Sequence, residues 1–352
     1  MAAHSAQAIE AELLAVTIGQ DEAVRSLAVA AAQHYARMAY QGDVPLKKAN
    51  VMLVGPTGVG KTMICRALAR ILDVPFSQVS APAITTPGVT GLDPDYTLKQ
   101  LLRRAGKGNK RQAERGIAYL DEVDKIARKD SDEGEKARNL TTGLGVQQAF
   151  LDVLDAGVWA FEDGETMDAS QVLFICSGAF VGIERFVAIR THAGLRAARP
   201  HPLSQAEALR ALEPVDLVSY GMIPEFVGRC PVLIALRPLE SHELVRILVE
   251  PRDSLLRRIT AEFEAIGAEL RISEQWLYAI ANEANEKRQG ARALEGVLRT
   301  HLRDAFHAAG SGTLVTIDAV GGWTVQQTVP AAPHSESFDP AKLAERTADP
   351  AV

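Results

Sequence analysis

The sequence has few cysteines and no cysteine pair of the kind that binds zinc. Its 352 residues include only Cys65, Cys176 and Cys230, which are widely spaced and form no Cys-x-x-Cys pair. Zinc modules and disulfide-rich secreted domains depend on closely spaced cysteines, so neither class is expected. Isolated thiols suit a reducing compartment, and we expect the protein to be cytoplasmic.

Long hydrophobic runs and a basic surplus are also missing. The apolar run at residues 27–32 is far too short to cross a bilayer, and the N-terminus lacks the pattern of a signal peptide. The formal net charge of −6 gives no broad attraction to nucleic acid. We therefore expect neither a membrane nor a nucleic-acid partner. With 47% hydrophobic and 23% charged residues, the chain has a globular composition and is long enough for two domains.

Short apolar runs alternate with helical patterns through the first two thirds of the chain. The runs predicted to be strands are 50–54, 75–79, 117–120, 172–176 and 232–236. Helical spacing of apolar residues is found at 21–39, 63–72, 96–105 and 146–154. This alternation predicts an α/β fold with a parallel sheet and right-handed crossovers.

The pattern changes after Pro238, where helical segments follow one another. They are expected at 241–250, 251–266, 273–287 and 291–309, with Pro251 at the start of the second and Ser273 as the N-cap of the third. A small hairpin is expected from 314–317 and 323–325. We predict a large α/β domain at 1–240, a small mainly helical domain at 241–328 and a flexible tail at 329–352.

The most informative stretch is the glycine-rich turn that follows the first apolar run. Glycines allow backbone N–H groups to turn toward phosphate oxygens, and a helix N-terminus adds positive potential. The spacing matches a phosphate-binding loop, in which Lys61 would reach the β- and γ-phosphates of a nucleotide and Thr62 would offer its hydroxyl to Mg²⁺. The residues assigned to nucleotide binding are Gly55, Pro56, Thr57, Gly58, Val59, Gly60, Lys61, Thr62 and Met63.

A second nucleotide motif ends the apolar run at 117–120. Asp121 and Glu122 follow it directly, at the carboxyl end of a predicted parallel strand, where open α/β sheets bind ligands. Asp121 is predicted to hold Mg²⁺ together with Thr62. Glu122 is predicted to orient the attacking water and accept its proton, so that Lys61 and Glu122 are catalytic candidates.

Beyond these two motifs, the chain resembles AAA+ ATPases of the ClpX unfoldase family over roughly residues 15 to 310. The resemblance rests on many short segments in the same order. These are Ile18-Gly19-Gln20, residues 55–62, Arg115-Gly116-Ile117, residues 120–125, residues 145–149, residues 173–176, Gly178-Ala179-Phe180, residues 223–229 and Gly290-Ala291-Arg292.

The resemblance implies roles for residues that no simple motif assigns. Arg229 matches the arginine finger, which reaches the γ-phosphate held by a neighbouring subunit and implies a ring, by family expectation a homo-hexamer. Arg292 matches the second sensor on the small domain, and Ser177 lies near the first sensor position. Val16 and Ile18 match residues that line the adenine pocket.

The chain also departs from the family pattern. No four-cysteine zinc domain is present in the sequence given. The aromatic residue of the first pore loop is replaced by Val89 in Gly88-Val89-Thr90-Gly91, and the basic second pore loop by the acidic residues 162–165. The Ile-Gly-Phe loop that docks on the ClpP peptidase is missing between Phe180 and Ile223, where the nearest segment is residues 194–196.

These observations predict a ClpX-like ATPase that remodels or unfolds a protein partner as a ring, without obligatory ClpP docking. One alternative is the ATP-binding unfoldase subunit of a Clp-type protease, which docks ClpP through a divergent loop. A second is a nucleotide-switch scaffold without productive hydrolysis. A third is a DNA-directed motor, which the mild acidic charge disfavours.

Overall fold

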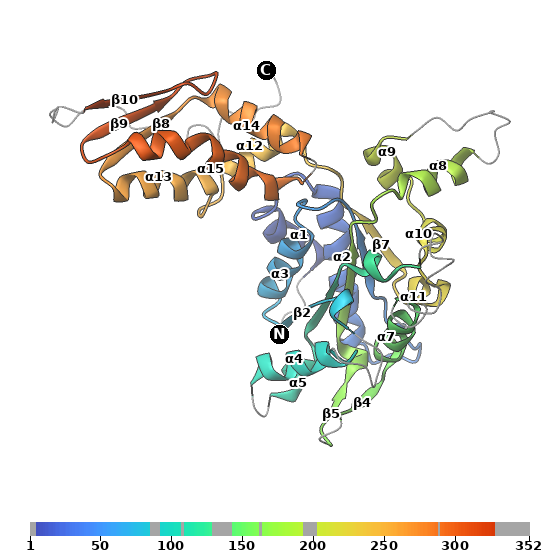
Figure 1. The fold of residues 1–352 in the computed structure, drawn as a ribbon. Helices are drawn as coiled ribbons and strands as arrows, with labels where there is room; N and C mark the ends of the chain where they lie inside the picture. The colour runs from blue at the N-terminus through green and yellow to red at the C-terminus, as the bar shows by residue number, and fades with distance from the viewer. Residues whose placement is uncertain are drawn as a thin grey trace. The chain divides into compact units, whose positions relative to one another are not determined.

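Five strands form one parallel sheet in the N-terminal part of the described chain (Figure 1). Their order across the sheet is β2-β3-β6-β1-β7, and every neighbouring pair is parallel. The strands correspond to the five predicted apolar runs, and they are β1 (Val51–Val54), β2 (Phe76–Ser80), β3 (Ile117–Asp121), β6 (Leu173–Gly178) and β7 (Val232–Ala235). The predicted α/β class and parallel sheet are therefore confirmed.

The computed structural model describes residues 5–84, 92–106, 109–128, 143–161, 164–192, 203–287 and 289–327. The chain divides into two units, one of Met1–Pro56 and Gly60–Pro238 and one of Thr57–Val59 and Leu239–Val352. Among the helices within these ranges, none is both long enough and apolar enough to cross a membrane.

The N-terminal unit has helices between most of its strands. The α-helices are α1 (Ala6–Leu14), α2 (Asp21–Ala39), α3 (Lys61–Ile71), α4 (Tyr96–Ala105), α5 (Lys110–Glu114), α7 (Gly145–Asp155), α8 (Glu184–His192), α9 (Gln205–Arg210), α10 (Pro214–Tyr220) and α11 (Pro224–Gly228). The 3₁₀ turns are η1 (Ala81–Ala83), η2 (Val123–Ile126) and η4 (Ala169–Gln171), and a small hairpin joins β4 (Val158–Ala160) to β5 (Thr166–Asp168).

Several short elements of this unit were not predicted from the sequence. No prediction was made for helix α5, for the β4–β5 hairpin or for helices α9 to α11. Each of these helices has five to seven residues. Two helical turns carry too little periodicity to be recognised, and tertiary contacts decide such segments.

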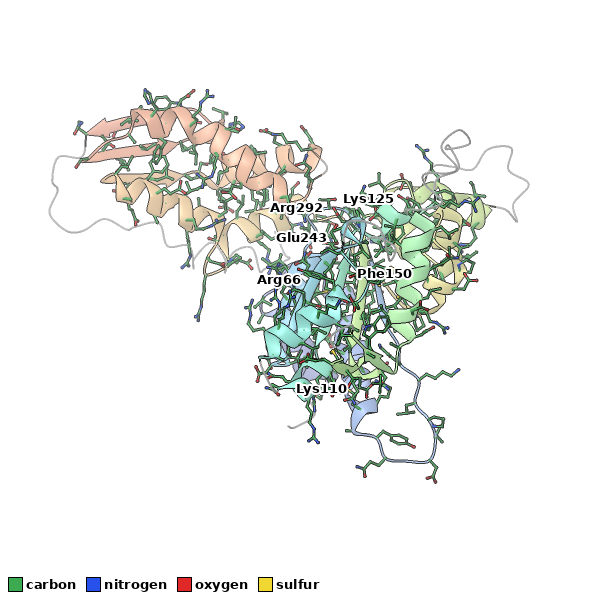
Figure 2. All side chains as sticks on the ribbon, turned by 60° about the horizontal axis from the view of Figure 1, so that its bottom comes forward. Arg66, Lys110, Lys125, Phe150, Glu243 and Arg292 are labelled. Carbon is green, nitrogen blue, oxygen red and sulfur yellow. The ribbon has the colours of Figure 1, made fainter. Side chains whose placement is uncertain are left out.

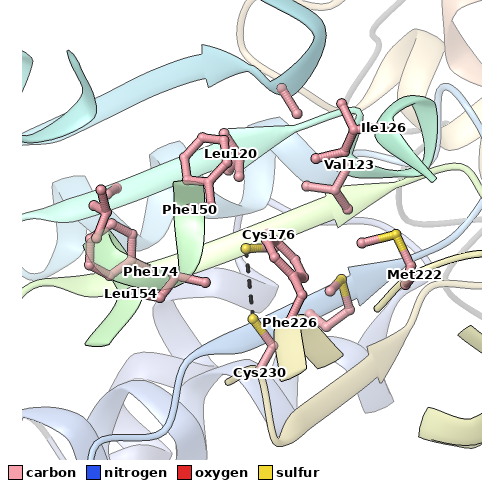
Figure 3. Packing of buried hydrophobic residues seen from close by; sticks show 14 of the residues in the cluster. Leu120, Val123, Ile126, Phe150, Leu154, Phe174, Cys176, Met222, Phe226 and Cys230 are labelled. Carbon is pink, nitrogen blue, oxygen red and sulfur yellow. Dashed lines mark hydrogen bonds between the residues drawn. The ribbon is translucent and has the colours of Figure 1, made fainter. Parts of the chain in front are cut away.

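The two faces of the sheet pack against different helices. In Figure 1, α1 and α3 lie on one side of the strands, while α7, α10 and α11 lie on the other. Alternate strand residues such as Leu120 and Phe174 join the core cluster of α7, which presents Phe150, Val153 and Leu154 (Figure 3). Burial of each large apolar side chain contributes about 2 kcal/mol, so this face is a main source of stability.

All three cysteines of the chain are buried inside this unit. The Sγ atoms of Cys176 on β6 and Cys230 after α11 lie 3.7 Å apart, and Figure 3 shows this contact in the core. The neighbouring thiol and burial raise the pKa of Cys176 well above its usual value, and burial raises that of Cys65. Cys65 and Cys176 therefore stay protonated and act as small apolar side chains.

Helix α2 and the chain that follows it hold the turn that leads into β6. His34 and Arg37 donate to the carbonyl oxygens of Gln171 and Ser170, at 2.8 and 2.7 Å, and Lys48 donates to that of Ala169 at 2.9 Å. Burial lowers the pKa of His34 to about 4. Burial and the charge of Arg37 lower the pKa of Lys48 to about 7. The start of β6 is thus fixed by three side chains from outside the sheet.

The C-terminal unit contains both helices and a small sheet. Its helices are α12 (Ser241–Val249), α13 (Leu255–Ala265), α14 (Glu274–Glu286) and α15 (Ala291–Ala308), and its strands β8 (Ala268–Ile272), β9 (Thr313–Ile317) and β10 (Trp323–Gln327) form a sheet of order β10-β9-β8. The predicted hairpin is confirmed as the antiparallel β9–β10 pair, whereas β8 was not predicted.

One helix start in this unit was predicted wrongly. Helix α13 begins at Leu255 rather than at Pro251, because the Ser254 hydroxyl accepts the N–H of Arg257 and caps the helix. Ser273 does precede α14 as expected, although no hydrogen bond from a backbone N–H caps it through its side chain. A capping side chain three residues further along thus outweighed the fixed φ of proline.

The buried imidazole of His34 predicts that acid destabilises the protein. Its pKa is about 4 in the folded chain and 6.5 when exposed, so between these values the unfolded state binds the proton and the folded state does not. The free energy of unfolding should fall by about 2 kcal/mol between pH 7 and pH 5 through this one group. Urea unfolding followed by circular dichroism should show a smaller loss, by about that amount, in His34→Gln. His242→Gln, at an exposed histidine, is the control, and equal losses in both variants would contradict the assignment.

Candidate nucleotide site

The glycine-rich loop connects β1 to α3 with a backbone that side chains would block. Gly55 N–H donates to Gly178 O, and a Cβ at Gly55 would lie 2.5 Å from the carbonyl oxygen of Leu236, so only glycine fits between the strand ends. Gly60 has a φ of +97° and immediately precedes α3. This left-handed conformation favours glycine, and it leads the chain directly into the helix N-terminus.

Lys61 is the first residue of α3 and folds back over the loop. Its ammonium donates to the carbonyl oxygens of Gly55 at 2.6 Å and Pro56 at 2.8 Å. The amine is therefore already at the centre of the loop that is predicted to surround phosphate. Among the other predicted loop residues, Val59 is buried, Pro56, Thr57, Gly58, Gly60 and Thr62 are half-buried, and Met63 is exposed.

The carboxyl end of β3 lies beside the start of α3. The Thr62 hydroxyl is 3.4 Å from Asp121 Oδ2, so the structure brings together the two predicted Mg²⁺ ligands. A hydroxyl and a carboxylate are hard oxygen donors, the kind that Mg²⁺ prefers, and Mg²⁺ commonly keeps several waters when one carboxylate and phosphates complete its shell. The donor set fits this ion, with Thr62 and Asp121 as the residues that would hold it.

Two buried hydroxyls support Asp121 from behind. Ser177 on β6 donates to Asp121 Oδ1 at 2.6 Å, and its oxygen is 2.6 Å from the hydroxyl of Tyr119. The Tyr119 hydroxyl also lies 3.2 Å from Thr62 Oγ1 and 3.3 Å from Asp121 Oδ1. Burial raises the pKa of Tyr119 further above its already high value. Ser177, which lies near the first sensor position of the family, thus contacts the carboxylate.

Glu122 points to a different neighbour because the chain turns sharply after Asp121. It has a φ of +60°, a left-handed conformation that is uncommon for residues with a side chain. The hydroxyl of Ser80, at the end of β2, donates to Glu122 Oε2 at 2.7 Å. Consecutive carboxylates are therefore held by different partners, as their different predicted roles require.

Arg229 lies at the end of α11 and pairs with its own chain. Its Nε is 2.6 Å from Asp155 Oδ1 at the end of α7, with the two side chains 52% and 41% exposed. Such exposed pairs contribute roughly 0 to 1 kcal/mol, so the guanidinium can change partners at little cost. The backbone is held more firmly, because Asn50 donates to the carbonyl oxygen of Arg229 at 2.9 Å.

The remaining predicted residues lie outside this group of contacts. Arg292, labelled in Figure 2, is exposed in the first turn of α15 in the C-terminal unit. Val16 and Ile18 lie between α1 and α2, where Val16 is 51% exposed and Ile18 is half-buried. The exposed apolar side chain of Val16 is available to a ligand.

Comparisons with known proteins decide which family has this arrangement. The family model for the AAA domain (Cdc48 subfamily) matches residues 46–233. The ATP-dependent Clp protease ATP-binding subunit ClpX of Porphyromonas gingivalis is 37% identical over 320 residues, which cover 85% of this chain and 76% of that protein. The chain belongs to the ClpX family of AAA+ ATPases. ClpX proteins of Treponema denticola and Borrelia duttonii are 35% and 36% identical, covering 84% and 89% of this chain and 74% and 77% of those proteins.

Membership of the ClpX family confirms several predictions at once. The chain is an ATP-binding enzyme, an ATPase with the α/β fold of this family. The resemblance seen in the sequence segments is likewise confirmed. The roles of individual residues stay predictions, although the structure places Thr62 next to Asp121 and Lys61 over the loop carbonyls.

Three residues of the site were missed by the sequence reasoning. Tyr119 lies two residues before Asp121, so strand periodicity places both side chains on one face of β3, and this signal was available. Ser80 pairs with Asp121 in the register of β2 and β3, which becomes visible only once the sheet order is known. Asp155 had no sequence signal, because an acidic residue at a helix end is common.

Several predictions about the pore and the tail concern residues that lie outside the described part of the chain. These are Val89 with residues 88–91, Glu162, Asp163, residues 194–196 and the tail at 329–352. Gly164 and Glu165 of the acidic segment are described, and they lie in the connection of the β4–β5 hairpin, where Phe161 N–H donates to Glu165 O at 2.8 Å. The acidic replacement of the second pore loop is therefore in part carried by a hairpin.

Two variants of the nucleotide site should separate binding from turnover. Lys61→Ala removes the cation from the loop and should weaken ATP binding, whereas Glu122→Gln keeps an acceptor for Ser80 but cannot take a proton, so it should bind ATP and lose at least 100-fold in turnover. Fluorescent-nucleotide binding and phosphate release measure the two effects. Arg66→Ala, at an exposed residue of α3 that donates to Gln78, is the control. Unreduced turnover by Glu122→Gln would show that another group is the base.

Proposed function

We propose that this ClpX-family ATPase uses ATP hydrolysis to unfold or remodel a protein partner, and that it works as a ring of identical subunits, by family expectation a hexamer. The observation that carries the proposal is the set of contacts at the end of β3, where Thr62, Asp121 and Glu122 are each held in a separate orientation. Family membership supports the unfoldase activity. An intact hydrolytic site argues against a nucleotide-switch scaffold.

The proposed chemistry is the attack of water on the γ-phosphate of ATP. Glu122 orients the water and accepts its proton, and Lys61 offsets the charge of the phosphates. Mg²⁺, when bound by Thr62 and Asp121, would neutralise charge on the β- and γ-phosphate oxygens. Val16 and Ile18 are proposed to contact adenine, and Arg292 to contact phosphate.

The proposed trans role of Arg229 requires subunits that face one another head to tail. A guanidinium from the neighbouring subunit would stabilise negative charge that develops during phosphoryl transfer. Its partner within the protomer, Asp155, is exposed, so leaving that carboxylate to water costs little. The guanidinium of Arg229 can therefore leave Asp155 for a phosphate group at little cost in free energy.

Mixed rings test whether Arg229 acts across an interface. Arg229→Ala should keep ATP binding and lose turnover, on the order of 1,000-fold by comparison with other arginine fingers. Mixing Arg229→Ala subunits with Glu122→Gln subunits should restore part of the activity, because some interfaces then pair an intact finger with an intact base. Phosphate release from mixtures of fixed total concentration measures this. A monomer as active as the assembled ring would exclude the trans role, and Arg229→Lys shows whether the bidentate geometry is needed.

The finer proposal is that ClpP docking is not obligatory. The sequence between Phe180 and Ile223 contains no Ile-Gly-Phe, and this supports the proposal. The identity of the relatives favours the alternative, since those proteins are ATP-binding subunits of the Clp protease.

The proposed compartment is the cytoplasm, which the widely spaced cysteines support. The proposed domains are a large α/β domain at 1–240 and a small helical domain at 241–328, followed by a tail at 329–352.

The pore loops should limit the force that each ATP delivers. Val89 has less contact area than an aromatic residue. Each contact between this loop and the translocated polypeptide should therefore be weaker by on the order of 1 kcal/mol. The wild type should therefore unfold a stable tagged protein slowly, and Val89→Tyr should raise that rate without raising ATP turnover. Loss of fluorescence of a tagged fluorescent protein, with and without ClpP, measures unfolding and degradation. Fast ClpP-dependent degradation by the wild type would support the alternative.

A further inference from the structure

The hydroxyls of Thr62, Tyr119 and Ser177 form a line that ends at Asp121. Successive oxygen atoms are 3.2 Å apart between Thr62 and Tyr119 and 2.6 Å apart between Tyr119 and Ser177. Ser177 Oγ is then 2.6 Å from Asp121 Oδ1. The line comes from three elements, α3, β3 and β6, and Ser177 and Tyr119 within it are fully buried.

Counting protons gives this line a direction. Each hydroxyl has one proton to donate, and a carboxylate can only accept. Ser177 donates its one proton to Asp121. In the short contact between Ser177 and Tyr119, Tyr119 must therefore be the donor. The oxygen of Tyr119 is then an acceptor for the proton of Thr62. The competing contacts, from Tyr119 to Asp121 Oδ1 and from Thr62 to Asp121 Oδ2, are longer, at 3.3 and 3.4 Å.

We propose that Tyr119 and Ser177 are positioning residues that orient both magnesium ligands through this directed chain of hydroxyls. The inference rests on the proposed Mg²⁺ roles of Thr62 and Asp121. A hydroxyl that binds a metal through its oxygen must send its proton elsewhere, and Tyr119 accepts it. Ser177, with the Glu122 N–H at 3.0 Å, occupies Oδ1 of Asp121 and leaves Oδ2 on the side of Thr62.

Packing and strand pairing hold the side chains of this chain of hydroxyls in place. The ring of Tyr119 stacks against Phe76 of β2, with centroids 5.9 Å apart, and Ser177 lies inside the paired part of β6. A Tyr119→Phe variant keeps this packing and removes only the hydroxyl. Outer contacts of this kind commonly alter metal affinity by 10- to 100-fold, because they fix the direction in which a ligand presents its oxygen.

Metal affinity measured without turnover tests the proposal. Mn²⁺ stands in for Mg²⁺ and is titrated into the ring with a non-hydrolysable ATP analogue, and free Mn²⁺ is followed by electron paramagnetic resonance. Tyr119→Phe and Ser177→Ala should each weaken Mn²⁺ binding roughly tenfold, with nucleotide affinity in EDTA unchanged. The double variant should be no weaker than either single one, because either break interrupts the same chain. Ser177→Thr, which keeps a hydroxyl, should restore affinity.

The matched control is Ser77→Ala, which removes a fully buried hydroxyl on β2 that has no hydrogen-bond partner among the described residues. It should leave Mn²⁺ binding unchanged. Two results would overturn the proposed chain of hydroxyls. One is unchanged Mn²⁺ affinity in both Tyr119→Phe and Ser177→Ala, and the other is a loss of affinity in the double variant equal to the sum of the two single losses. Thr62→Val and Asp121→Asn distinguish an error in the proposed Mg²⁺ ligands from an error in the proposed positioning role. If these two variants do not weaken Mn²⁺ binding, Thr62 and Asp121 are not the ligands. If they alone weaken it, the ligands are right and the positioning role of Tyr119 and Ser177 is wrong. Thermal unfolding confirms that each variant is folded.

Discussion

The parallel pairing of β3 with β2 and β6 is the constraint on which the nucleotide site depends. In this register Ser80 lies opposite Asp121, and Leu120 lies opposite Cys176, which puts Ser177 next to the carboxylate. A slip of one residue would turn every side chain of β3 to the other face of the sheet. Asp121 would then point away from Thr62, so the metal ligands exist as a pair only because the register is fixed.

The register is fixed because the two faces of the sheet bury different chemistry. Toward α7 the strands present large apolar side chains, among them Phe174 and Leu120. Toward α3 the same strands end in Tyr119, Ser177 and Asp121, whose polar atoms bond to one another. An unpaired buried polar group costs about 1 to 3 kcal/mol, so exchanging the faces would be strongly unfavourable.

The entry of β6 into the sheet is controlled from outside it. The carbonyl oxygens of residues 169–171, just before the strand, accept hydrogen bonds from Lys48, Arg37 and His34. These donors lie near one another and share a buried environment, as the lowered pKa values of His34 and Lys48 show. Helix α2 therefore helps to set the position of Ser177, although α2 and β6 are far apart in the sequence.

Much of this architecture could be predicted from the sequence, for identifiable reasons. Buried parallel strands are continuous apolar runs, so β1, β3 and β6 were recognisable, and a phosphate loop needs glycines such as Gly55 and Gly60 at fixed spacing. Short helices such as α9 to α11 carry too few turns to be seen. Contacts between separate segments, such as Ser80 with Glu122 or Arg229 with Asp155, depend on sheet order and have no local pattern.

The burial of all three thiols has a practical consequence for watching this protein move. Cys65, Cys176 and Cys230 are inaccessible in the folded chain, and burial keeps the pKa of the Cys65 thiol high. Maleimide dyes react with exposed thiolates, so the unaltered protein should be silent to them while folded. A single cysteine placed on the surface would carry one dye per subunit, without deletion of native residues. Motion of the two units could then be followed optically in an otherwise unmodified chain.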